Sequence, residues 1–365
     1  GQGPLWESIM IPIVYFRSSS FNCHRFCPMQ YYLEYTLGWR GPSGQKADKG
    51  SIVHKILEIT ALCKKGAQDG KKIIVDNFIG RVSTSNPDPK YLEKVISRVY
   101  KKYTEGTPHH NWTEKDKKDC VKWVWKALEY NDGMFDPRNR NVIAAEPHFD
   151  ISIDKEWSSY SYELDGETVS GNLALKGTVD LITDLGDGVY EVIDWKTGRR
   201  LDWATGDKKE QKDLFKDPQL RLYHYAIKHL YPDVKAFLVT VYFINDGGAY
   251  TVHFQDEDLP KTEEMLKNKF QFIKNTTEPQ TLPELNPSQC WKCSKLCHQG
   301  KTTFEGTNIK PLTERRVGKR TRHGETMTKC EQTRYMIDKY GIDWANSNLS
   351  NPEHSIGTYK SPGEI

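Results

Sequence analysis

Apolar residues recur every three or four positions in the first part of the chain, a spacing that predicts helices. Residues 21–37 form one such segment, with serines at 18–20 as possible caps before it and Gly38 as a stop after it. A second helix is expected to begin near Gly50. Residues 63–140 are rich in lysine and helical in pattern, and we interpret them as a helical insertion.

Strand signals begin with residues 142–153 and return at residues 178–182 and 189–196. The last two segments are separated by the turn at 184–188, so they are expected to form a hairpin. Residues 236–244 are almost continuously apolar, as expected of a strand that is covered on both faces.

Helices are expected between and after these strands. Asp217 and Pro218 are a favourable N-cap and first position for a helix through Leu230. A strand over residues 250–254 and a helix over residues 259–274 complete the pattern. The central order is therefore strand, strand, helix, strand, strand.

The composition limits the class of protein. Of 365 residues, 28% are charged and the net charge is only +3, so a nucleic-acid surface would be a local patch in a mixed exterior. No apolar run approaches the roughly 20 residues of a membrane span, and no secretory signal is recognisable. We expect a soluble, cytoplasmic protein, with residues 1–9 a tag remnant outside the fold and Met10 the natural start.

Two carboxylates and a lysine lie on the predicted hairpin. Asp194 and Lys196 share one face of a strand, while Trp195 points to the other, and hairpin pairing can bring Asp180 beside them. Mg²⁺ or Mn²⁺ relieves the repulsion between two such carboxylates. The ion can also polarise a phosphodiester and lower the pKa of a bound water that Lys196 orients or deprotonates. An ordinary exposed Asp–Lys pair explains this segment, taken alone, equally well.

Three further segments stand in order around this centre. Gly50-x-x-x-His54 opens the second predicted helix, Gln219-x-x-x-Tyr223 lies in the helix after residues 189–196, and Glu146 precedes a proline. Each has an ordinary explanation on its own, such as packing on one helical face for the glutamine and the tyrosine.

The ordered set resembles the PD-(D/E)XK nuclease superfamily, in the form seen in RecB-like exonucleases, including CRISPR-associated and AddB-type iron-sulfur nucleases. Val179 stands where the name of the signature implies proline. The resemblance covers about residues 18–297 and implies an α/β fold, a restriction-endonuclease-like core with a mixed central sheet flanked by helices. It places the nuclease domain at 10–305, with the insertion at 63–140, and leaves 306–365 as a basic extension.

The resemblance also implies roles for the residues of the motifs. The implied Mg²⁺ or Mn²⁺ ligands are a histidine, two aspartates, a backbone carbonyl and a supporting glutamate: His54, Asp180, Asp194, Ile193 and Glu146. Lys196 would handle the nucleophile, and Gln219 and Tyr223 would contact DNA or support Lys196. The expected activity is exonucleolytic cleavage of linear, single-stranded DNA in recombination or repair, with a helicase or recombinase as a conceivable partner. A flap or junction endonuclease and a non-catalytic DNA-binding protein are the alternatives.

Cysteines predict a second metal centre. Three lie in one short segment: Cys290, Cys293 and Cys297. A tetrahedral site needs a fourth ligand, and Cys27, followed by Pro28, resembles the segment that supplies it in the iron-sulfur members of this family. We expect a four-iron, four-sulfur cluster that ties the two ends of the domain together. Zinc is the alternative, with Cys23 and His298 as spare ligands.

The chain after these cysteines is basic. A cationic stretch within it contains Lys310, Arg315, Arg316, Lys319, Arg320, Arg322 and His323. This stretch can hold phosphates by charge, and a solvated tail explains it equally well.

Overall fold

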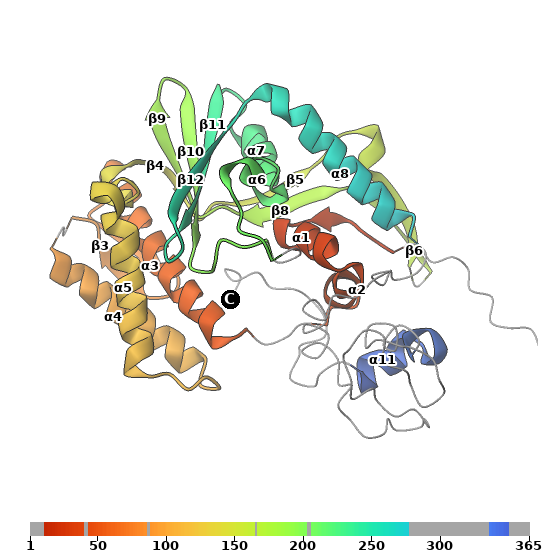
Figure 1. Ribbon diagram of the computed structural model, residues 1–365, viewed down its shortest axis with the longest axis horizontal. Coiled ribbons are helices and arrows are strands. Elements are labelled where there is room, and N and C mark those ends of the chain that lie inside the picture. The colour runs from red at the N-terminus through yellow and green to blue at the C-terminus, as the bar shows by residue number, and fades with distance from the viewer. Residues whose placement is uncertain are drawn as a thin grey trace, which may run out of the picture.

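A mixed sheet in the order β12-β11-β10-β9-β4 forms the centre of the structure (Figure 1). The computed structural model describes residues 11–39, 43–85, 88–164, 166–202, 206–276 and 336–349. The strands of this sheet are β4 (Asn141–Ala145), β9 (Leu181–Gly186), β10 (Val189–Lys196), β11 (Ala236–Phe243) and β12 (Gly248–Phe254). β10 pairs parallel with β11, and the other neighbours are antiparallel. The expected α/β fold with a mixed sheet is confirmed, as is the hairpin of β9 and β10.

A second sheet, in the order β1-β8-β5, continues from the central one. Its strands are β1 (Tyr15–Phe16), β5 (His148–Ser152) and β8 (Ala174–Thr178). The chain passes from β4 into β5 and from β8 into β9. These two connections cross from one sheet to the other next to each other. Glu146 N donates to Asp180 O at 2.9 Å, and Val179 N donates to Pro147 O at 3.1 Å. We call residues 146–147 and 179–180 the corner.

The corner corrects two predicted strands. Residues 142–153 and 178–182 were each expected to form one strand, and each is divided where the chain changes sheets. Pro147 has no N–H to donate, and Glu146 has a φ of 47°, in the left-handed region that ends a regular strand. Asp180 therefore lies between β8 and β9 and not within a strand.

Helices cover both faces of the central sheet (Figure 1). On one face α3 (Gln45–Gln68) packs with α4 (Pro89–Gly106) and α5 (Glu114–Gly133). On the other lie α1 (Ser18–Phe26), α6 (Gln211–Phe215), α7 (Pro218–Leu230) and α8 (Leu259–Lys274). Successive residues of β10 serve the two cores in turn: Ile193 and Trp195 join the first and Val192 the second.

The first predicted helix is interrupted. α1 ends at Phe26, and Cys27 is extended, with φ −158° and ψ 110°. The short α2 (Pro28–Tyr31) and a π-helix (Tyr32–Thr36) follow. A single helix over residues 21–37 was wrong because the ring of Pro28 disfavours helical backbone in the residue before it. Gly38, with a φ of 75°, ends the segment as predicted.

The second helix starts earlier than expected, at Gln45, so that Gly50 lies inside α3. The predicted helical insertion also contains a hairpin, β2 (Ile73–Asp76) and β3 (Gly80–Ser83). β-branched residues favour extended backbone, and Asp76 accepts from the N–H groups of Phe78 and Ile79 in the turn. A further hairpin, β6 (Ser159–Leu164) and β7 (Glu167–Asn172), was not predicted.

The helices α7 and α8 lie where the sequence predicted them. Asp217 caps α7 by accepting from Gln219 N at 2.8 Å, and α8 lies where a helix was expected. Short 3₁₀ turns cover Pro137–Asn139, Glu156–Ser158 and Asp256–Asp258. Near the C-terminus, α11 (Ile342–Asn348) contacts the N-terminal part, where Trp39 Nε1 donates to Asn346 Oδ1 at 2.7 Å. Among the described helices, none is long and apolar enough to span a membrane.

We expect the buried His224 of α7 to make the fold sensitive to acid. Its ring stacks on Phe254, and among the described residues neither ring nitrogen has a hydrogen-bond partner. Burial lowers its pKa from 6.5 to about 4. Between about pH 6.5 and 4 the imidazole of His224 is therefore protonated in the unfolded chain but neutral in the folded one. The free energy of unfolding falls as the pH drops through this range.

His224→Phe should gain stability relative to the wild type by on the order of 1–3 kcal/mol between pH 7 and pH 4. Urea unfolding across this range measures the difference, and His253→Phe, at an exposed position of β12, is the control. Parallel pH curves for wild type and His224→Phe would contradict this account.

Candidate active site

The end of β10 carries a charged pair on one face. Asp194 and Lys196 point to the same side, and Lys196 Nζ lies 3.0 Å from Asp194 Oδ2. Trp195 points to the other side and packs against Tyr242, with ring centroids 5.7 Å apart. This is the arrangement expected from the alternation of side chains in a strand.

The corner brings Asp180 to this pair. Leu181 is the last residue of β9 that pairs with β10, opposite Ile193. At the next position along β10, a side chain takes the place of the backbone carbonyl that would continue the pairing. Asp180 Oδ2 accepts a hydrogen bond from Trp195 N at 2.7 Å. Asp180 is thereby held beside Asp194.

His54 reaches the same place from α3. Its Nε2 lies 3.5 Å from Asp180 Oδ2 and 2.7 Å from Trp195 O, and its Nδ1 lies 2.8 Å from Gly50 O. Ile193 and Trp195 are two residues apart in β10, so their carbonyl groups point to the same edge. The structure thus brings His54, Asp180 and Asp194 together at one end of the sheet. The backbone oxygen beside His54 is that of Trp195, whereas Ile193 pairs with Leu181 one step further into the sheet.

Gly50 is required where α3 passes the chain that follows β10. A Cβ atom at position 50 would lie 2.6 Å from Thr197 Oγ1. A larger residue would force the Thr197 hydroxyl to turn away or α3 to move, and a movement of α3 would shift His54, which lies one turn later. The sequence motif therefore has a physical reason: the glycine lets the helix of the histidine approach the strand of the lysine.

The two aspartates have opposite pKa shifts. Burial, with a contribution from Asp180, raises the pKa of Asp194 to about 6 although Lys196 opposes the shift. Burial also acts to raise the pKa of Asp180, but His54 and Lys196 outweigh it and hold that pKa below its ordinary value. For His54, desolvation is outweighed by Asp180 and the Gly50 carbonyl, which raise its pKa to about 9.

Tyr223 approaches the carboxylates from α7. Its side chain is buried, and burial together with the charges of Asp194 and Asp180 raises its pKa well above the ordinary value. Gln219 Nε2 donates to Tyr223 Oη at 3.0 Å. Both residues of the predicted helical motif therefore belong to the surroundings of the site, with the tyrosine the nearer to the carboxylates.

Glu58 is a site residue that the sequence reasoning missed. It shares a hydrogen bond with Glu146 at the corner, and burial and that neighbour raise its pKa to about 8 against the opposing charge of Lys55. Glu58 stands four residues after His54 in α3 and so lies on the same helical face. That spacing was a signal available in the sequence.

The donor set suits a divalent cation. Asp194 Oδ2 is buried, and its partner among the described residues is the Lys196 ammonium at 3.0 Å. One imidazole with carboxylate and carbonyl oxygens suits Mg²⁺ or Mn²⁺. The side chains must close in around an ion, since in the described chain only Asp48, His109 and His110 bring three ligand atoms within 4.8 Å of one another.

The cysteine prediction is only partly within the described residues. Cys27 is buried at the break between α1 and α2, where its Sγ accepts from Gln30 N at 3.4 Å. Cys23 Sγ donates to Glu34 Oε2 at 3.6 Å. Outside the described residues lie Cys290, Cys293, Cys297 and His298, together with the basic stretch Lys310, Arg315, Arg316, Lys319, Arg320, Arg322 and His323.

A comparison with models of known protein families gives one match that covers most of the chain. Residues 18–297 match the PD-(D/E)XK nuclease superfamily. No curated protein matches the sequence. The structure is similar to the crystal structure of a candidate exonuclease from Eubacterium rectale, at 13% identity and a TM-score of 0.41, over 75% of this chain and 87% of that one. For the crystal structure of SSO0001 the identity is 12% and the TM-score 0.23, over 76% and 91% of the two chains. Structural similarities of this size carry no argument, and the assignment rests on the family match.

Replacing Gly50 should weaken divalent-metal binding without unfolding the protein. In Gly50→Ala the new methyl group displaces Thr197 or α3, which moves His54 relative to Asp180. A change of this kind next to a ligand costs roughly 10–100-fold in metal affinity. Calorimetric titration with Mn²⁺ measures the change, and Gly106→Ala, where a Cβ atom meets nothing within 4 Å, is the matched control. Equal Mn²⁺ affinity in the two variants would show that α3 need not approach so closely.

Proposed function

Because the chain belongs to the PD-(D/E)XK nuclease superfamily, we propose that it is an Mg²⁺- or Mn²⁺-dependent exonuclease that degrades linear, single-stranded DNA. Nuclease activity follows from the family, and the preference for DNA ends is our proposal. The observation that supports a working catalytic centre is the convergence of Asp180, Asp194, Lys196 and His54 at the end of β10.

His54, Asp180, Asp194 and the Ile193 carbonyl would hold the metal, with Glu146 and Glu58 next to them at the corner. A bound divalent cation would polarise the phosphodiester and make its bound water more acidic. The protein supplies the positions: Trp195 N fixes the carboxylate of Asp180, and the Gly50 carbonyl fixes the ring of His54.

We propose that Lys196 orients the attacking water and balances the charge that develops on the phosphate. Its ammonium group, 3.0 Å from Asp194, supports this role. Tyr223 lies behind the carboxylates, where Gln219 fixes its hydroxyl. We propose that this pair supports the catalytic face of β10 and positions the DNA.

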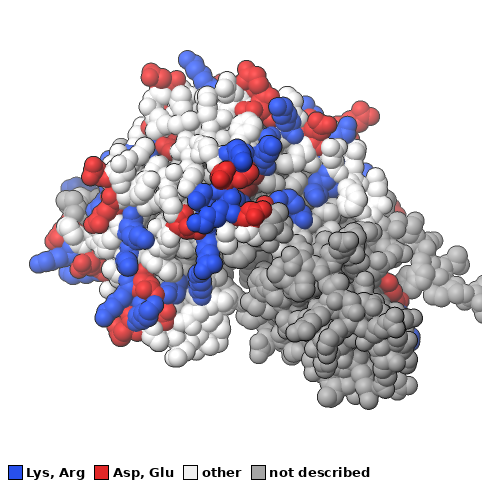
Figure 2. All heavy atoms as spheres, viewed as in Figure 1, with Lys and Arg blue, Asp and Glu red and all other residues white. Residues whose placement is uncertain are grey.

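Basic residues near the site offer contacts for the DNA backbone. On the face seen in Figure 2, Lys and Arg side chains gather across the middle of the described surface, with acidic side chains among them. The chain directly after β10 carries Arg199, Arg200 and Lys208, and the Arg200 guanidinium stacks on Tyr250 at 4.6 Å. Charged contacts of this kind bind phosphates regardless of base sequence. Arg315, Arg316, Lys319 and Arg320 are proposed as further contacts.

We also propose that Cys27, Cys290, Cys293 and Cys297 hold a four-iron, four-sulfur cluster. The burial of the Cys27 thiol at a helix break supports this, because a ligand held away from water in a fixed backbone suits a cluster. Zinc remains the alternative occupant, with Cys23 and His298 as further ligands.

The nuclease proposal predicts metal-dependent loss of end-labelled linear single-stranded DNA, with circular single-stranded DNA left intact. Asp194→Asn should lower the cleavage rate by roughly a thousandfold or more, because removing one charged ligand disrupts the metal centre. Gel analysis with Mg²⁺, Mn²⁺ and excess EDTA measures the effect, and Asp184→Asn, in the turn end of β9, is the matched control.

The outcomes separate the alternatives. Cleavage of the circular substrate would replace the exonuclease by an endonuclease. DNA binding without cleavage of any substrate would favour a non-catalytic DNA-binding protein.

The cluster proposal predicts that anaerobically purified protein is brown and that Cys27→Ser is colourless. Loss of one thiolate breaks the ligand set, whereas Cys63→Ser, at a cysteine outside it, should keep the colour. Visible absorption and iron analysis provide the measurement. Colourless wild-type protein that contains zinc would replace the cluster by a zinc site.

A further inference from the structure

Two adjacent histidines meet an aspartate from a different helix, away from the nuclease residues. His109 and His110 lie in the loop between α4 and α5, and Asp48 lies in the first turn of α3. One ligand atom of each residue lies within 4.8 Å of the other two. His110 Nε2 is 2.5 Å from Asp48 Oδ2, and the two imidazole rings have centroids 4.1 Å apart.

The surroundings fix the carboxylate of this cluster. Tyr103 Oη donates to Asp48 Oδ1 at 3.1 Å, which leaves Oδ2 directed at the histidine. Asp48 is only 4% exposed, whereas His109 is exposed, so an ion could enter from the solvent side. Ligands of metals are commonly held by such outer hydrogen bonds.

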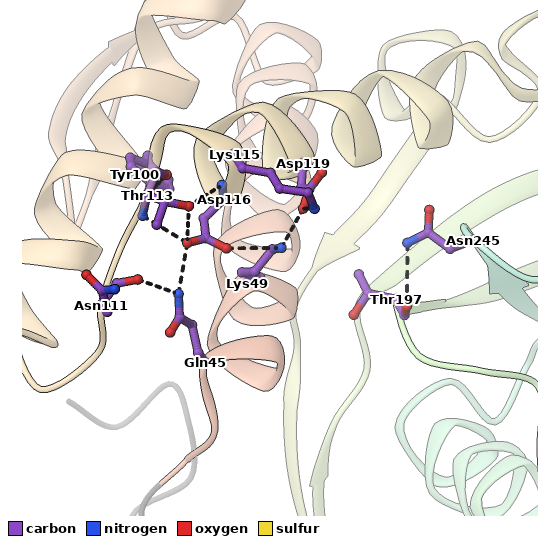
Figure 3. A network of polar contacts seen from close by, with 10 residues as sticks. All are labelled: Gln45, Lys49, Tyr100, Asn111, Thr113, Lys115, Asp116, Asp119, Thr197 and Asn245. Carbon is purple, nitrogen blue, oxygen red and sulfur yellow. Dashed lines mark hydrogen bonds and ion pairs between the residues drawn. The ribbon is translucent and has the colours of Figure 1, made fainter.

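The loop and the start of α5 are held against α3 by contacts that do not involve the cluster (Figure 3). Gln45 Nε2 donates to Asn111 O at 3.0 Å and to Asp116 Oδ2 at 2.8 Å. Lys49 Nζ lies 3.3 Å from Asp116 and 2.7 Å from Asp119. The three ligand residues are therefore already positioned, which lowers the entropic cost of binding an ion.

We propose that Asp48, His109 and His110 bind Zn²⁺, with water completing a tetrahedral site. An Asp–His pair that only stabilises the fold needs one histidine. Here both adjacent histidines bring a ring nitrogen near the same carboxylate. Two imidazoles and one carboxylate favour zinc over Mg²⁺, which prefers oxygen ligands. The inference goes beyond the proposed function and does not depend on it.

The position of the cluster gives the ion a structural role. Asp48 precedes His54 by six residues in the same helix, or roughly 9 Å along its axis. Zinc at the cluster would clasp the loop between α4 and α5 to the helix that carries His54. It would be a centre separate from the nuclease metal.

Chemical protection tests the site in the unmodified full chain. Diethyl pyrocarbonate modifies free imidazole, and mass spectrometry assigns the modification to each histidine. With free Zn²⁺ at about ten times its Kd, modification of His109 should fall roughly tenfold by mass action, while Mg²⁺ should leave it unchanged. His253, exposed on β12, should react equally with and without zinc. Unchanged modification of His109 in saturating zinc would overturn the proposal.

Stoichiometry provides the second measurement. After zinc loading and desalting, His109→Ala should hold one zinc ion fewer per chain than the wild type, and His253→Ala should hold the same number. His109 is exposed, so its replacement should leave the unfolding temperature of the metal-free protein unchanged. Wild-type zinc content in His109→Ala would also overturn the proposal, whatever the nuclease activity.

Discussion

The site depends on two backbone hydrogen bonds at the corner, from Glu146 to Asp180 and from Val179 to Pro147. They hold the two segments together where both leave one sheet for the other. Asp180 is thereby released from regular strand pairing, and its side chain can bond to Trp195 N in place of a backbone carbonyl. A carboxylate is thus fixed at the end of β10 by the same geometry that continues the sheet. The residues of the corner therefore both join the two sheets and position a carboxylate of the site.

α3 is the second constraint, because one rigid helix serves several places at once. Its first turn presents Asp48 to the loop after α4, its middle presents His54 to Asp180, and Glu58 one turn later meets Glu146. Glycine at residue 50 lets the helix lie this close to the Thr197 hydroxyl after the end of β10. A small displacement of α3 would therefore move residues at the insertion, at the metal ligands and at the corner together.

Much of the catalytic face could be predicted from sequence, because strand alternation alone sets Asp194 and Lys196 against Trp195. The corner could not, since a run of strand-forming residues does not reveal where the chain changes sheets. Gly50 was taken for a helix start on local preference, whereas its place inside α3 is set by the distant Thr197. Glu58 was missed because its contact with the site is through Glu146, which lies far away in the sequence.

The pairing of β1 with β8 affects how the chain can fold during synthesis. Tyr15 lies opposite Ala174, so the N-terminal strand has no partner until about 160 further residues have been made. At about 5–20 residues per second this delay lasts on the order of 10–30 seconds, during which apolar residues such as Ile13 and Phe16 lack their final cover. β1 thus waits much longer for its partner strand than β9 and β10, which pair across a short turn, and nascent chains would need protection from aggregation at β1.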